Sequence, residues 1–313
     1  MKITIRKHIA VFSAITAAVL YSISSPVSKL LLSEIPPALM ASLLYLGAGF
    51  GMASINLIQK KLIPGSKDTP FVKQDFPYIA GMILLDIAAP FLLMTGLSKA
   101  SAANVSLLNN FEIVATSLIA LTLFREKITG RLWFGIGLIT LSSLILSLPE
   151  PGSLSFSYSS LFVLGACVCW GFENNCTRML SKNSPLKVVI IKGFGSGTGS
   201  LLLSFLLHEN GIAPFYIFCT LILGFVSYGL SIFCYVYAQR SLGAAKTSAY
   251  YSVSPFIGVF LSLIIFREIP HVSFALAFLV MAAGTYYTST DGKKIRFFSF
   301  RKKTITHVEN PII

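Results

Sequence analysis

The sequence predicts an all-α polytopic membrane protein in which ten transmembrane helices form two inverted-topology five-helix repeats. Three observations support this fold class: an apolar composition, ten apolar spans and an internal repeat. The 313 residues are 54% hydrophobic and only 12% charged, with a mean hydropathy of +0.76. Such a composition leaves too little polar surface for a water-soluble protein of this length.

Each span is long enough for a membrane, because a hydrocarbon core of about 30 Å needs about 20 apolar residues in a helix. The first span follows Lys2, Arg6 and Lys7 and exceeds the apolar core of a signal peptide, so we expect an uncleaved first helix. The connections are too short for a separate domain. In chain order, the predicted spans are residues 9–32, 36–58, 76–97, 100–124, 130–148, 158–181, 184–207, 214–239, 243–266 and 271–289.

The internal repeat pairs the fourth span with the ninth. The pattern Ala-Ala-x-x-Ser begins at Ala102 and again at Ala244, and Phe-Arg-Glu ends at Glu126 and again at Glu268, an offset of 142 residues in both cases. Because each half then holds an odd number of spans, the second half enters the membrane in the opposite orientation. We predict a first repeat over residues 1–150, a second over 151–290 and a basic tail over 291–313.

The basic residues indicate the orientation. With the N-terminus in the cytoplasm, all 25 Lys and Arg residues except Lys29, Lys99 and Arg267 fall on the cytoplasmic side, as the positive-inside rule requires. The net charge of +13 is therefore a topology signal and predicts no nucleic-acid partner. Both termini are expected in the cytoplasm, with the cations and aromatics of residues 293–303 against anionic lipid headgroups.

Three acidic residues interrupt the apolar spans, and an acid at this depth normally faces a cavity or a partner. Glu112 is central in its span, with Asn109 and Thr116 one helical turn to either side. Burial disfavours the ionised form of a carboxyl group, so Glu112 can exchange a proton or pair with a substrate ammonium group. The structural alternative is a protonated Glu112 that hydrogen-bonds a neighbouring helix.

The repeat offset extends this candidate site to the second half. Asp86, four residues before Pro90, corresponds to Tyr228, and Glu112 corresponds to Ser254. Acids would thus line one half of the site and hydroxyl groups the other. Tyr251 corresponds to Asn109 and is expected to line the cavity.

The sixth span adds Glu173 and Asn174, with Arg178 near enough to pair with Glu173. A local ion pair and a cytoplasmic gate are both open interpretations of Glu173. Trp170 and Tyr21 occupy matching positions when Arg178 is aligned with Lys29. Such aromatic rings can stack on a substrate or close a gate, or they can simply pack the bundle.

Glycines and cysteines in the spans favour structural roles. Gly193, Gly195, Gly197 and Gly199 are followed by no Gly-Lys-Ser/Thr, which excludes a phosphate-binding loop. Their spacing instead favours close helix packing, as it does for Gly47-x-x-x-Gly51. Cys167-x-Cys169 has no His or Cys at ligand spacing, so the sequence predicts neither a metal nor a cofactor.

Together these features resemble the EamA-type branch of the drug/metabolite transporter superfamily. The resemblance extends to about residue 290 and rests on the ten spans, the paired Ala-Ala-x-x-Ser and Phe-Arg-Glu patterns, Asn109-x-x-Glu112 and Ser254-Pro255. It implies a metabolite transporter in a bacterial inner membrane. The chain departs from many members in having Ile113 where the first repeat would match Pro255. It also has no acid in span one, so the coupling mechanism of the four-helix multidrug exporters is not implied.

We therefore predict a secondary active exporter of a small, polar, amine-bearing metabolite that works by alternating access, coupled to protons or by exchange. The candidate site residues are Glu112, Asp86, Glu173, Asn109, Asn174, Trp170, Tyr21, Tyr228, Tyr251 and Ser254.

Two other functions stay open. An exchanger of anionic or nucleotide-linked metabolites would use Lys29, Arg178 and Lys192, although these lie toward span ends where long basic side chains reach the interface. The second alternative function is that of a membrane sensor that transports nothing. An intramembrane protease is disfavoured, because Asp86 lacks a Gly-x-Gly-Asp setting and Ser196 lacks a Gly-x-Ser-Gly setting.

Overall fold

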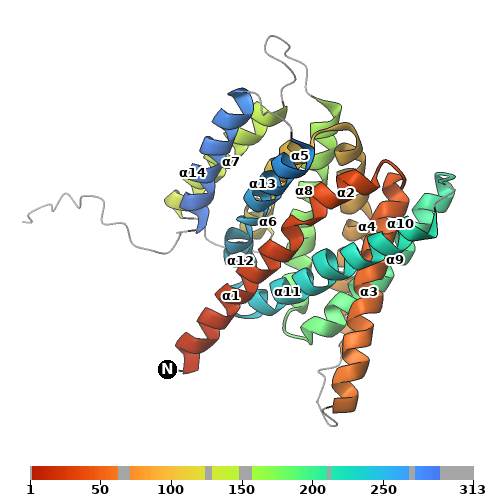
Figure 1. Ribbon diagram of the computed structural model, residues 1–313. Coiled ribbons are helices and arrows are strands. Elements are labelled where there is room, and N and C mark those ends of the chain that lie inside the picture. Colours follow the sequence, from red (N-terminus) through yellow and green to blue (C-terminus); the bar gives the residue numbers. More distant parts are fainter. Residues whose placement is uncertain are drawn as a thin grey trace, which may run out of the picture.

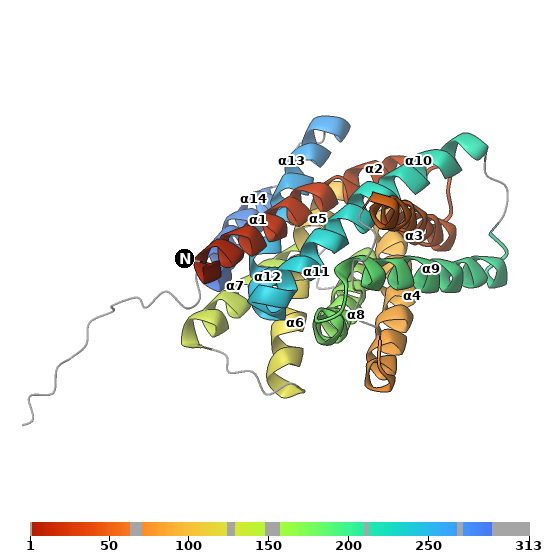
Figure 2. The same cartoon turned by 90° about the horizontal axis from the view of Figure 1, so that it is seen from below.

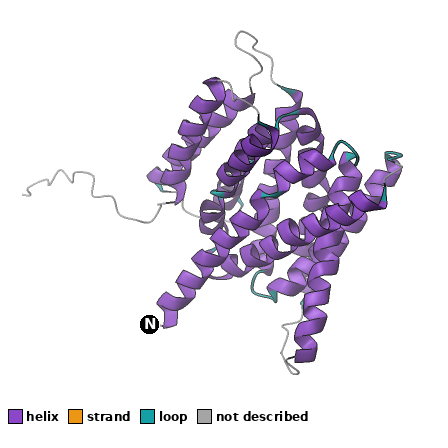
Figure 3. Cartoon of the chain, in the orientation of Figure 1, coloured by secondary structure: helices purple, strands orange, loops and turns teal. Residues whose placement is uncertain are grey.

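The computed structural model describes residues 2–62, 71–123, 129–147, 157–209, 213–267 and 272–289. These residues form helices joined by short turns and contain no β-strand (Figure 3). The predicted all-α polytopic membrane fold is confirmed. The predicted basic tail, the motif at Phe124-Arg125-Glu126 and Glu268 lie outside the described residues.

Among the described residues, the first half of the chain forms five spans, and two of them are broken into two helices each (Figure 1). The first span consists of α1 (Lys2–Ser22) and α2 (Ser24–Leu31), and the fourth of α5 (Ala102–Leu108) and α6 (Phe111–Thr122). The other spans are α3 (Pro37–Leu62), α4 (Phe76–Lys99), which follows the short 3-10 helix η1 (Lys73–Asp75), and α7 (Gly130–Ser147).

The second half also contains five spans, but only its broken ninth span matches a break in the first half. The sixth, seventh and tenth spans are α8 (Tyr158–Leu180), α9 (Pro185–Leu206) and α14 (Val272–Ser289). The eighth runs through α10 (Pro214–Gly224), the π-helix η2 (Phe225–Leu230) and α11 (Ser231–Leu242). The ninth is broken into α12 (Ala244–Tyr251) and α13 (Ser254–Phe266).

The surface exposes many large apolar side chains, and polar side chains lie buried among the apolar ones of the interior, as is typical of a membrane protein. Large hydrophobic side chains such as Leu84, Phe218 and Phe260 are more than 60% exposed, whereas Asp86 and Thr116 are fully buried. Six described helical segments are long and apolar enough to cross a membrane, and α7, α13 and α14 are shorter apolar helices. The 23-residue α8 is more polar than these because it carries Glu173 and its neighbours.

The two halves are interleaved. α3 lies along α9, α7 along α14, and α5 along α13, so each of these pairs joins equivalent spans of the two repeats (Figures 1 and 2). The third span (α4) contacts the sixth (α8). The equivalent spans of the opposite repeats, the eighth (α11) and the first (α1), are also in contact. The packing therefore follows the pseudo-two-fold symmetry of an inverted repeat.

Two of the helix breaks occupy equivalent positions in the two repeats. The ninth span is interrupted just before Pro255, which has no N–H to donate to the carbonyl of Tyr251. The fourth span is interrupted at Asn109 and Asn110, where the backbone N–H groups of Glu112 and Ile113 bond back three residues at 3.1 and 3.0 Å. The fourth span is thus broken even though it has Ile113 where the ninth span has Pro255.

The glycine spacing in α9 allows close helix packing, as predicted, and the structure shows that the neighbouring helix is α3. A Cβ atom at Gly193 would lie 2.5 Å from the Cα of Gly49, and one at Gly197 would lie 2.9 Å from the side chain of Leu46. Only glycine allows two backbones to approach to this distance. The close approach also brings the residue next to Gly193 into the interior.

Candidate functional site

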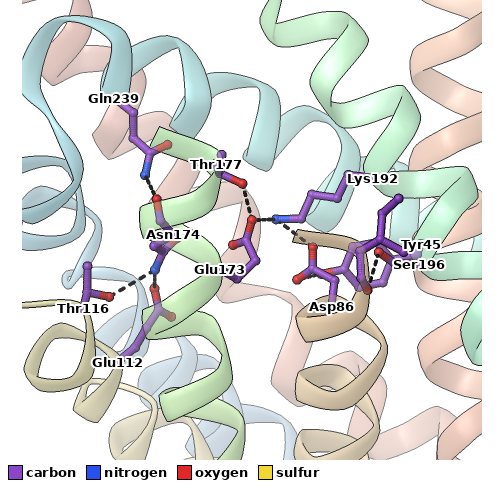
Figure 4. A network of polar contacts seen from close by, with 11 residues as sticks. Tyr45, Asp86, Glu112, Thr116, Glu173, Asn174, Thr177, Lys192, Ser196 and Gln239 are labelled. Atoms are coloured by element: carbon purple, nitrogen blue, oxygen red, sulfur yellow. Dashed lines mark hydrogen bonds and ion pairs between the residues drawn. The ribbon is translucent and has the colours of Figure 1, made fainter. Parts of the chain in front are cut away.

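The residue next to Gly193 is Lys192, and it joins two of the acids in the centre of the bundle (Figure 4). Its Nζ lies 3.0 Å from Oδ2 of Asp86 on α4 and 2.9 Å from Oε1 of Glu173 on α8. The three residues are nearly inaccessible, with exposed fractions of 4% for Lys192, 0% for Asp86 and 2% for Glu173. A buried ammonium group is thus shared by two carboxylates from different halves.

The expectation that Lys192 reaches the membrane interface is wrong. Lys192 lies seven residues into α9, about 10 Å from the start of the helix, and its side chain turns inward. Two carboxylates within ion-pair distance offset the cost of removing the ammonium group from water. The sequence signal was present, because Lys192 interrupts an apolar run well inside the seventh span.

Hydrogen bonds hold the two carboxylates in place. The hydroxyl group of Tyr45 donates to Oδ1 of Asp86 at 2.8 Å, and Oγ1 of Thr177 donates to Oε1 of Glu173. The sequence had suggested Arg178 as the ion-pair partner of Glu173 and did not indicate Lys192. With both acids ionised, one ammonium against two carboxylates leaves one negative charge uncompensated.

Glu112 lies on α6 and has a neutral hydrogen-bond donor. Nδ2 of Asn174 on α8 donates to Oε1 of Glu112 at 2.6 Å and lies 3.2 Å from Oγ1 of Thr116. Nε2 of Gln239 on α11 donates to the backbone carbonyl of Asn174 at 3.3 Å (Figure 4). The bond between Glu112 and Asn174 therefore connects the two repeats without an opposite charge.

A cavity with an empty volume of about 460 Å³, counted to its open edge, lies between these groups. Both repeats contribute to its wall, and most of the wall is aromatic or polar. It is lined by Tyr21, Tyr45, Glu112, Trp170, Glu173, Asn174, Thr177, Lys192, Tyr228, Ile232, Tyr235 and Tyr251.

The aromatic part of this wall is continuous and centres on Tyr21, the last aromatic residue before α1 ends. The ring centroid of Tyr21 lies 6.4 Å from that of Trp170 and 5.6 Å from those of Tyr228 and Tyr251. Tyr228 belongs to the π-helix η2 in the eighth span, a local irregularity that is frequent at functional sites.

Two predicted site residues, Asn109 and Ser254, line a different pocket. This smaller pocket, of about 180 Å³, lies among the helix breaks of the first, fourth and ninth spans. Tyr21 lines both pockets. The smaller pocket is lined by Tyr21, Ser22, Ser25, Ser106, Asn109, Ser254, Pro255 and Gly258.

Seven of the ten predicted site residues therefore line the main cavity, and Asp86 lies directly behind Lys192. Sequence reasoning considered Lys192 only for an anion exchanger and placed it toward the interface, and it did not select Tyr45, Thr177, Ile232 or Tyr235 for the site. Both tyrosines lie inside apolar spans at positions that no repeat pattern distinguishes. Among the described residues no group of three His, Cys, Asp or Glu side chains could hold a metal ion, and the five cysteines are free thiols.

Comparisons with known proteins agree with this architecture. The profile of the EamA-like transporter family matches residues 8–148 and again 157–290. An uncharacterized transporter from Methanothermobacter thermautotrophicus is 27% identical over 313 residues, covering 90% of this chain and 86% of the relative. The fold is also similar to that of a solved protein whose description, "Crystal structure of protein", states no function. The two structures match with a TM-score of 0.65 at 16% sequence identity, over 90% of this chain and 95% of the other.

Proposed function

Because the chain belongs to the EamA-like transporter family, we propose that it is a secondary active exporter of a small, amine-bearing metabolite, with Glu112 as the group that accepts the amine or a proton. One observation carries this proposal. Glu112 lines the cavity and bonds to the neutral amide of Asn174, whereas Asp86 and Glu173 share Lys192. Glu112 is thus the acid whose charge a substrate can neutralise.

The contact between the repeats suggests how binding drives transport. An ammonium group or a proton at Glu112 competes with Nδ2 of Asn174 for the carboxylate, and this competition weakens a contact between α6 and α8. The inverted halves can then rock about the bound site, with the broken helices absorbing the change. Alternating access follows from two such orientations of the halves.

Orientation and location are part of the same proposal. The distribution of Lys and Arg supports cytoplasmic termini, and the family resemblance supports a bacterial inner membrane and outward transport. Transport assays on inside-out and right-side-out vesicles measure the direction.

The test of the function is transport by purified protein in liposomes. A thermal-shift screen of amine-bearing metabolites selects the substrate, and its flux is then measured under an imposed pH gradient. Glu112→Gln is expected to reduce gradient-driven flux at least about tenfold, as expected when one buried charged contact is lost. Glu34→Gln, at an exposed glutamate, is the control. Flux in Glu112→Gln equal to that of the control refutes the assignment.

An exchanger of anionic metabolites is the second candidate, because Lys192 lines the cavity. Two carboxylates already neutralise this ammonium group, which makes the site a poor anion receptor. Counterflow of a phosphorylated metabolite that survives Glu112→Gln but fails in Lys192→Gln would favour this candidate over the first.

A further inference from the structure

We propose that the cavity selects an N-alkylated ammonium group, best a quaternary one, which Tyr21, Trp170 and Tyr251 hold by cation–π contact while Glu112 neutralises its charge. This inference rests on the proposed role of Glu112 and adds the chemical class of the amine. Neither the family match nor the relatives specify this class.

The wall of the cavity provides the aromatic surface that such a group needs. The rings of Tyr21, Trp170 and Tyr251 form one connected cluster, with Tyr21 between the other two at centroid distances of 6.4 and 5.6 Å. They come from α1, α8 and α12, so both repeats contribute. A cation within about 6 Å of such ring faces is attracted by their quadrupoles, most strongly when it is desolvated.

The counter-charge is in the same place. Glu112 lines the same cavity as these rings. A cation between the rings therefore lies in the same cavity as the carboxylates of Glu112 and Glu173. Asp86 and Glu173 already share Lys192. Glu112 instead bonds to the neutral amide of Asn174, so Glu112 is the acid with which a cationic ligand can pair.

A primary ammonium group brings three N–H donors, and each of them needs an acceptor in the cavity. Part of the acceptor supply is used by the protein itself. Oε1 of Glu112 accepts from Asn174, both oxygens of Asp86 have partners, and Oε1 of Glu173 accepts from Lys192 and Thr177. A buried N–H group without an acceptor is costly, whereas a quaternary nitrogen has no N–H group to satisfy.

The hydroxyl groups of two further tyrosines are also engaged. The Tyr45 hydroxyl donates to Asp86 at 2.8 Å, and the Tyr235 hydroxyl lies 2.7 Å from Oγ of Ser248. These bonds fix the rings and commit their polar atoms to the protein. Tyr45 and Tyr235 therefore present mainly aromatic carbon to a ligand.

Three probes that share one skeleton test the inference on the purified full-length protein: ethanolamine, choline and the uncharged carbon isostere of choline, 3,3-dimethyl-1-butanol. Binding is measured by calorimetry and by the shift in thermal unfolding. Choline is expected to bind about tenfold or more tighter than either of the other two, the ratio that a desolvated cation–π contact gives.

Variants on α1 separate the ring from the fold. Tyr21→Leu is expected to lower choline affinity about tenfold with little change for ethanolamine, and Tyr21→Phe, which keeps the ring, is expected to retain most of the affinity. Phe12→Leu removes an aromatic ring that is 71% exposed on the same helix and serves as the matched control. Tyr251→Leu repeats the test on α12 should Tyr21→Leu unfold.

The outcomes distinguish this inference from the function on which it rests. Ethanolamine binding at least as tightly as choline, in a manner abolished by Glu112→Gln, overturns the N-alkyl selectivity and leaves the proposed function intact. Choline binding unaffected by Tyr21→Leu and Tyr251→Leu overturns the aromatic contact. Amine binding or transport that is indifferent to Glu112→Gln overturns both proposals.

Discussion

Asn174 and Glu112 are joined across the two repeats by a hydrogen bond of 2.6 Å from Nδ2 to Oε1. The donor lies on α8 of the second half and the acceptor on α6 of the first. A carboxylate in the membrane interior usually has a cationic partner or a solvated cavity. Here the Glu112 carboxylate has a neutral donor, Asn174, and also faces the cavity. A ligand in the cavity can therefore replace Asn174 as its partner.

Removal of this donor is expected to impair transport more than folding. Asn174→Leu leaves Glu112 and Thr116 without the amide, so the flux is expected to fall about tenfold, the size of one hydrogen bond to a charged group. The initial rate in proteoliposomes measures the effect. Asn104→Leu, which removes an amide that donates to the Leu146 carbonyl instead, is the control. Equal rates in the two variants would contradict the role of Asn174.

Removal of the ammonium group of Lys192 is expected to destabilise the protein. Lys192→Met leaves Asp86 and Glu173 buried without their cation, and breaking such a pair costs about 3–5 kcal/mol. Denaturation in detergent is expected to show this loss, and the triple variant Lys192→Met, Asp86→Asn, Glu173→Gln is expected to recover most of it. Lys246→Met, at an exposed lysine, is the control. A single variant as stable as this control would mean that the ion pairs do not support the fold.

The close approach of α9 to α3 predicts different costs for one substitution at two glycines. Gly193→Ala places a methyl group 2.5 Å from the Cα of Gly49 and is expected to cost about 1–3 kcal/mol through overpacking. At Gly137 of α7 nothing lies within 4 Å of the added methyl group, so Gly137→Ala is expected to be neutral or slightly stabilising. Thermal unfolding of both variants compares these costs. Similar stabilities would show that α3 and α9 do not pack at this distance.

Glu209 caps the start of α3 from the other half of the chain. Its two carboxylate oxygens accept from the backbone N–H groups of Ala38 at 3.2 Å and Leu39 at 2.8 Å. Glu209→Ala is expected to cost about 1 kcal/mol, as the loss of a helix cap does, and Glu209→Gln is expected to cost less because it keeps one acceptor. Chemical denaturation measures both. Transport that falls while stability is unchanged would assign Glu209 a role other than capping.

The fold could be predicted because its signals are local and repeated. Span lengths, the offset that relates Ala102 to Ala244 and the Phe-Arg-Glu ends are all visible in the sequence. The position of Lys192 was not predicted, because depth along a span does not say which face of the helix points inward. That face is set by the contact of Gly193 with Gly49, two residues far apart in the sequence.

Part of the site was predictable for the same reason. Glu112 and Tyr251 were found because an acid in an apolar span and a repeat offset are sequence features. The separation of Asn109 and Ser254 into the smaller pocket depends on where the helices break. In the first repeat this break occurs at two asparagines instead of a proline, a weaker signal in the sequence.

Cysteine accessibility tests the central claim most directly, which is that the two inverted halves enclose a water-filled site reached from either side in turn. Thr177→Cys, in a background without the native cysteines, places a thiol in the cavity wall. Leu84→Cys, at a residue 66% exposed on the apolar surface of α4, is the matched control. A small, membrane-impermeant thiosulfonate is expected to modify the first thiol and spare the second, and saturating substrate is expected to change the rate from each side. Thr177→Cys that stays as unreactive as Leu84→Cys from both sides, with and without substrate, would contradict the account.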